Sequence, residues 1–93
     1  MKAKPVLKRI LPAVAQSFGL AENDIMSHSR KAELVDARSM TVALLLSHPQ
    51  LRQQDAARLL DISQAAVSHL LARHQWLMLT DKAYRERYEA INR

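Results

Sequence analysis

The scarcity of glycine is the feature that most restricts the fold. The chain has 93 residues and a single glycine, Gly19, so it contains no Asn-Gly or Asp-Gly pair. Two-residue β-hairpins depend on such pairs because their turn positions need positive φ. Apolar residues instead recur at helical spacing, most clearly over residues 34–45. The sequence therefore predicts an all-α, compact domain of five to six helices.

Caps and breaks divide the chain into its expected elements. Residues 1–10 are basic and form either an arm or the start of the first helix, which we expect from about residue 6 or 11 to 18, where Gly19 ends it. Residues 11–93 then form a single helical domain. Its further helices are expected over residues 21–27, 32–47, 52–60 and 64–75, with a last helix capped by Thr80 after an apolar hinge at 76–79.

Residues 53–74 carry the pattern of a helix-turn-helix, in which two short helices pack across each other. Such a crossing needs a small residue midway along the first helix, and Ala57 meets that need. The second helix must bury positions five and eight residues beyond the turn, where Val67 and Leu70 stand. The alternative is an ordinary helical hairpin with alanine at a close crossing.

The turn between these two helices has a matching chemistry. Asp61 occupies the position that needs a left-handed backbone, and aspartate is among the few side chains that adopt it. Ile62 is the branched apolar residue that fills the turn, and Ser63 is a good N-cap for the second helix.

A helix placed in this way turns one polar face outward, and in DNA-binding proteins that face enters the major groove. The residues expected on it are Gln64, Ala65, Ser68, His69 and Ala72. Gln64 can bond to adenine through two hydrogen bonds, and Ala65 can touch a thymine methyl group. Ser68 and His69 can reach bases or phosphates. The alternative for each residue is a solvated helix face.

The charge of the chain suits a polyanionic partner. The chain has 14 Lys and Arg against 9 Asp and Glu, a net charge of +5. Basic domains attract nucleic acid, although many small domains are mildly basic for solubility alone. Lys4 and Lys8 in the N-terminal stretch, and Arg73 on the second helix, are expected to hold phosphates.

Residues 11–91 resemble the C-terminal DNA-binding domain of the bacterial replication initiator DnaA, a Trp-repressor-like helix-turn-helix fold, and similar modules end some transposase-type proteins. The resemblance rests on VAQSFGLAENDIMSHSRKAELVDARSMTVALLL, on ARLLDISQAAVSHLLARH and on the tail YRERYEAI. It implies duplex DNA as the partner. The segment SRKAELVDARSM is the most distinctive, because a generic helix-turn-helix would lack it.

The resemblance also implies roles for a basic loop before the long helix. Arg30 matches an arginine that enters the minor groove of DNA. A narrow minor groove concentrates negative potential and therefore attracts arginine. Lys31 lies beside it, and Arg38 matches a phosphate-binding arginine on the long helix. The alternative is a solvated loop. The full set of expected phosphate contacts is Lys4, Lys8, Ser29, Lys31, Arg38, Ser63 and Arg73.

The chain differs from the initiator at the residues with which the initiator recognises its DNA target. The initiator begins its recognition helix with Asp-His-Thr-Thr-Val, whereas residues 63–67 here are SQAAV. The initiator's target sequence is therefore not carried over. The chain also has no glycine-rich phosphate loop, so we expect a reader domain without an ATPase motor.

We expect neither an enzyme nor a cofactor site. There is no cysteine, which excludes disulfides and thiolate metal sites and fits a reducing cytoplasm, where DNA binding would associate the protein with the nucleoid. His69 and His74 are five residues apart, which is the wrong helical spacing for a shared metal ion. Ser68 adjoins His69 on one helix and so points elsewhere than a catalytic serine. No apolar run approaches the ~20 residues that span a bilayer.

The apolar run at residues 76–79 has two interpretations. It is either a bent junction buried within the monomer or a surface for a second copy or protein partner built on Trp76 and Met78. The leading function is a small regulator of transcription or of a mobile element. A protein-interaction module and the DNA-binding fragment of a larger replication initiator or transposase are the alternatives.

Overall fold

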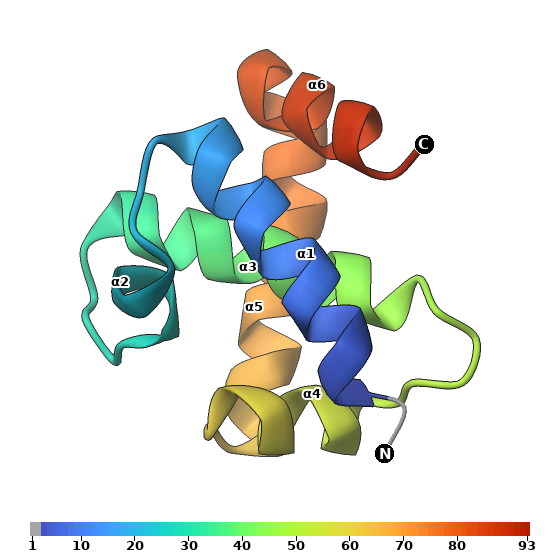
Figure 1. Ribbon diagram of the computed structural model, residues 1–93. Coiled ribbons are helices and arrows are strands. Elements are labelled where there is room, and N and C mark those ends of the chain that lie inside the picture. Colours follow the sequence, from blue (N-terminus) through green and yellow to red (C-terminus); the bar gives the residue numbers. More distant parts are fainter. Residues whose placement is uncertain (1–2) are drawn as a thin grey trace.

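Six helices make up residues 3–93, the part of the chain that the computed structural model describes (Figure 1). They are α1 (Ala3–Phe18), α2 (Glu22–Met26), α3 (Ala32–Leu46), α4 (Gln53–Leu60), α5 (Gln64–Thr80) and α6 (Lys82–Ile91). No strand occurs in these residues. The prediction of an all-α fold with five to six helices is confirmed.

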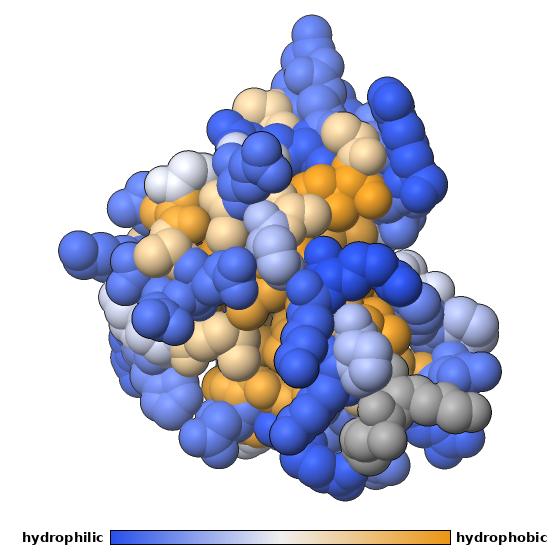
Figure 2. All heavy atoms as spheres, viewed as in Figure 1, coloured by the Kyte–Doolittle hydropathy of each residue, from blue (hydrophilic) through white to orange (hydrophobic). Residues whose placement is uncertain are grey.

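Helix α3 forms the centre of the molecule, with α1 and α5 packed against it (Figure 1). Met40, Val42 and Leu45 on it are fully buried. The buried hydroxyl of Thr41 donates to the carbonyl of Ala37 at 2.8 Å, which lets a polar side chain lie in the core without an unpaired donor. Hydrophilic side chains cover most of the face seen in Figure 2, and apolar side chains show in the furrows between them.

Helix α1 begins earlier than the sequence predicts. It is helical from Ala3, so the described part of the basic N-terminal stretch is the first turns of a helix. Pro5 lies in the first turn, where a backbone N–H has no helical acceptor anyway. Pro12 lies inside the same helix, and packing of Val14 and Leu11 into the core holds the chain helical through it.

The turn between α4 and α5 has the predicted chemistry. Asp61 adopts the left-handed region, with φ 54° and ψ 50°. The N–H of Ile62 donates to the carbonyl of Ala57 at 3.0 Å and closes the turn. Ser63 caps α5, because its Oγ accepts from the N–H of Ala66 at 3.0 Å. Ala57 and Val67 are buried as expected, and Leu70 is half-buried.

The hinge expected at residues 76–79 is wrong, since α5 continues through it to Thr80. In a continuous helix four consecutive residues point in different directions, so only those on the inner side are buried. Leu77 is buried and Met78 half-buried, whereas Trp76 and Leu79 are exposed. Asp81, and not Thr80, caps the last helix.

Helix α6 is fixed to α5 through aromatic side chains. Tyr84 is buried, and its hydroxyl lies 2.7 Å from Nδ1 of His74. The ring of His74 also lies against that of Tyr88, with centroids 4.8 Å apart. Burial lowers the pKa of His74. His74 therefore packs between α5 and α6, where its burial favours the uncharged imidazole.

Candidate nucleic-acid interface

The residues expected to face a DNA groove lie on the outer side of α5. Gln64, Ala65, Ser68, His69 and Ala72 are all exposed. The opposite side of the helix holds its buried residues and contacts α3. The predicted outward orientation of this face is confirmed, and what it contacts stays a prediction.

Ser68 has a partner that the sequence did not reveal. Its Oγ donates to Oε1 of Gln53, the first residue of α4, at 3.2 Å. This bond fixes the orientation of the Gln53 amide, whose two N–H donors remain for another acceptor. The helical spacing of α5 does not reveal Gln53, because this residue lies on a different helix, at the start of α4.

A surface hollow of about 340 Å³ joins the basic loop to α5. Arg30 from the loop and His69 from α5 both line it, and Arg38 of α3 lines it as well. Its full lining is Ser27, His28, Arg30, Val35, Arg38, Ile62, Ala66, His69 and Leu70. Residues that stand 39 positions apart in the sequence thus share one surface, as an interface built on both elements requires.

Hydrogen bonds order the loop that carries Arg30. The hydroxyl of Ser27 donates a hydrogen bond to the carbonyl of Asp24 at 2.6 Å, and its Oγ accepts one from the N–H of Ser29 at 3.3 Å. Ser29 in turn accepts from the N–H of Lys31 at 3.3 Å. Ser29 is thus partly engaged within the loop, while the side chains of Arg30 and Lys31 are exposed. The loop presents two cations from a hydrogen-bonded backbone.

Arg38 is not the exposed side chain that the resemblance implies. It is only 8% exposed, and its Nε donates to the carbonyl of Ile25 at 2.6 Å. Its Nη2 is buried and has no hydrogen-bond partner among the described residues. Burial lowers the pKa of its guanidinium. A buried donor on a charged group without an acceptor carries a free-energy cost.

Arg73 forms an ion pair within the protein that the sequence did not indicate, and its contact with a phosphate stays a prediction. Its Nε lies 2.6 Å from Oδ1 of Asp36 on α3, and this is the one ion pair within residues 3–93. The carboxylate neutralises much of the arginine's charge where the two helices meet. The prediction overlooked Asp36 because the two residues are far apart in the sequence.

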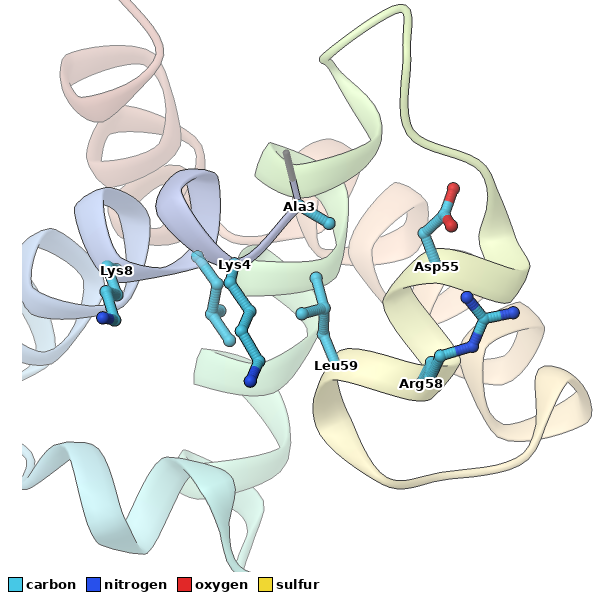
Figure 3. A pocket seen from close by; sticks show the side chains of 7 residues that line it. Ala3, Lys4, Lys8, Asp55, Arg58 and Leu59 are labelled. Carbon is cyan, nitrogen blue, oxygen red and sulfur yellow. The ribbon is translucent and has the colours of Figure 1, made fainter. Parts of the chain in front are cut away.

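The N-terminal lysines lie apart from the hollow that Arg30 lines. Lys4 and Lys8 line a groove of about 390 Å³ between α1 and α4 (Figure 3). Arg58 and Asp55 of α4 lie on its other side, and half-buried Leu7 and Leu59 supply apolar lining. No residue is shared between the two sites. The structure therefore does not unite the lysines with the other expected phosphate contacts.

The described residues do not meet the requirements of a metal site or of a membrane-spanning helix. Within residues 3–93 no group of three or more His, Cys, Asp or Glu side chains is placed to hold a metal ion. In the same residues no helix combines the length and apolar character needed to cross a membrane.

Comparisons of the chain with protein-family models, curated proteins and solved structures found no match.

Proposed function

We propose that this chain binds duplex DNA with a Trp-repressor-like or DnaA-like helix-turn-helix made of α4 and α5. In this proposal α5 enters the major groove and the loop at residues 27–31 reaches the neighbouring minor groove and backbone. The observation that carries it is the hollow that joins Arg30, Arg38 and His69 beside the exposed face of α5. Helix α5 contains no acidic residue, so nothing on it repels a phosphate.

The start of α5 supports this orientation electrostatically. The first turn of a helix exposes backbone N–H groups and the positive end of the helix dipole, which attract anions. The first turn of α5 contains no acidic residue, and the cap is a neutral serine, Ser63. Gln64 and Ala65 follow at once on the exposed face. Gln64 suits the two-bond recognition of adenine, and Ala65 suits contact with a thymine methyl.

The hollow supplies the sequence-independent part of the binding. Arg30 fits the minor groove, because a narrow groove attracts a guanidinium. Lys31 is exposed beside it and suits a phosphate. Arg38 lines the hollow, and a phosphate there would offer its guanidinium an acceptor if a small rearrangement exposed the buried Nη2. This arrangement belongs to a reader domain, such as a regulator of transcription or of a mobile element.

A salt titration tests the proposal. Fluorescence anisotropy on a random-sequence duplex should give a log–log slope of affinity against salt of about −4 to −5, as expected for about five phosphate contacts. Arg30→Gln should weaken binding about tenfold, a loss within the range of a single good groove contact. Lys82→Gln is the matched control, since it removes the same charge from an exposed position on α6 and should bind like wild type.

The result that would reject the proposal is a slope near zero, or equal losses in the two variants. The groove between α1 and α4 favours the second candidate, a protein-interaction module, because apolar Leu7 and Leu59 lie there among charged residues. That candidate gains if duplex DNA fails to bind even at low salt.

A further inference from the structure

The exposed face of α5 extends well beyond the half proposed to read DNA. Five of its exposed residues are spaced alternately four and three residues apart, namely Ala65, His69, Ala72, Trp76 and Leu79. This alternation is the spacing of the contact seam between two paired helices. We call these five residues the α5 seam. Its C-terminal part holds Trp76, 59% exposed, and Leu79, 82% exposed, the large hydrophobic residues that the described chain leaves in solvent.

The α5 seam is complementary to itself. When two copies of α5 lie antiparallel about a two-fold axis at Ala72, Leu79 of one copy faces small Ala65 of the other. Trp76 then faces small Ser68 and lies beside His69, and Ala72 faces Ala72. In a two-fold interface every contact occurs twice, so each large side chain meets a small one on both sides of the axis. The two alanine positions also allow the helices to approach closely.

The charges of α5 permit such a pairing. Although the chain carries a net charge of +5, none of the nine exposed residues of α5 is Lys, Arg, Asp or Glu. They are Gln64, Ala65, Ser68, His69, Ala72, Gln75, Trp76, Leu79 and Thr80. Like charges that meet at an interface cost several kcal/mol, and the exposed residues of α5 contribute none. Helices α4 and α6 pack at the two ends of α5 and α3 packs on its inner side (Figure 1).

The size of the face sets the strength of the pairing. A stable interface uses roughly 20–30 residues a side. The nine exposed residues of α5 are well short of that number, so the area suits a weak and reversible pair.

We propose that α5 pairs with α5 of a second copy through the α5 seam, and that this pairing and the reading of DNA exclude each other. The exclusion rests on the proposed function, because Ala65, His69 and Ala72 belong both to the seam and to the face that would enter the groove. The monomer is then the DNA-reading form, and a rising protein concentration withdraws that face from solvent.

Single thiols test the pairing, since the chain has no cysteine. Ala72→Cys places a thiol at the two-fold axis, where the close approach that a disulfide needs is met. At high micromolar concentration under mild oxidation it should form a linked dimer at least fivefold faster than Ala83→Cys, the control on an exposed position of α6. A mixture of Ala65→Cys and Leu79→Cys should link preferentially as the mixed pair.

Leu79→Glu completes the test, because its side chain is exposed and the change leaves the core intact. Pairing should bury Trp76, the sole tryptophan, and shift its fluorescence to the blue as the protein concentration rises. The variant should remove both this shift and the fast linkage of Ala72→Cys. Equal linkage of Ala72→Cys and Ala83→Cys, or a sedimentation coefficient independent of concentration, would overturn the pairing.

The same oxidation in the presence of duplex DNA distinguishes the pairing of α5 from the proposed DNA binding. Duplex DNA should slow the linkage of Ala72→Cys at least fivefold, and linkage that continues unchanged on DNA-bound protein would overturn the exclusion. The oxidation without DNA reports on pairing even if the chain binds no DNA. Conversely, anisotropy on dilute protein reports on DNA binding even if no pair forms.

Discussion

Arg38 lines the hollow, and replacing it by methionine should lower the affinity for DNA while leaving the free energy of unfolding nearly unchanged. The change removes the bond from Nε to the Ile25 carbonyl. Leaving that buried acceptor unpaired costs about 1–3 kcal/mol. The same change removes the orphaned Nη2 donor, whose burial without a partner is itself a cost of about 1–3 kcal/mol. Methionine fills a similar volume, so the two effects nearly cancel.

The expected result is a free energy of unfolding within about 1 kcal/mol of wild type, because the lost and relieved costs are of equal size. Affinity for duplex DNA should fall about tenfold, as for the loss of one charged contact. Urea unfolding followed by circular dichroism and anisotropy on one duplex measure the two quantities on the same samples. Arg38→Lys is the control that keeps the charge but loses the planar fork. A variant destabilised by more than about 3 kcal/mol that still binds DNA like wild type would show that Arg38 is purely structural.

Four further predictions concern single side chains. Burial lowers the pKa of His74, so its contribution to stability should be complete above its ordinary value of 6.5 and should decline as the pH falls below it; urea unfolding of wild type and His74→Gln between pH 7.5 and 5 checks this difference. Ser63→Ala should lower the free energy of unfolding by about 1 kcal/mol through loss of the α5 cap, a loss that thermal melting detects. Asp61→Val should cost about 1–2 kcal/mol because φ is 54°, whereas Asp61→Gly should not destabilise the turn in the same assay. Gln64→Ala should cost about 1–3 kcal/mol at one base pair only, which competition between duplex sequences measures.

Local chemistry made much of the architecture predictable. The left-handed Asp61 and the Ser63 cap follow from short-range rules, because the partner groups lie within a few residues. The extent of α5 was not predictable in the same way. Four consecutive apolar residues suggest a bend only when all of them are assumed to be buried, and here Trp76 and Leu79 remain exposed.

The candidate site was predictable only in part, since side-chain pairing depends on the tertiary structure. The outward face of α5 follows from helical periodicity and required no tertiary information. The engagement of Arg73 by Asp36 and the burial of Arg38 against Ile25 depend on how helices and loops pack. Arginines that look equivalent in the sequence therefore differ in the structure, with Arg30 exposed and the other two held by protein groups.

Nuclear magnetic resonance titration with a short duplex tests the central claim most directly. If α5 and the basic loop together contact DNA, the amide signals of Gln64, Ser68 and His69 and of residues 27–31 should shift in proportion to added duplex, while those of α6 stay in place. Shifts confined to α6, or no shift at low salt, would contradict it.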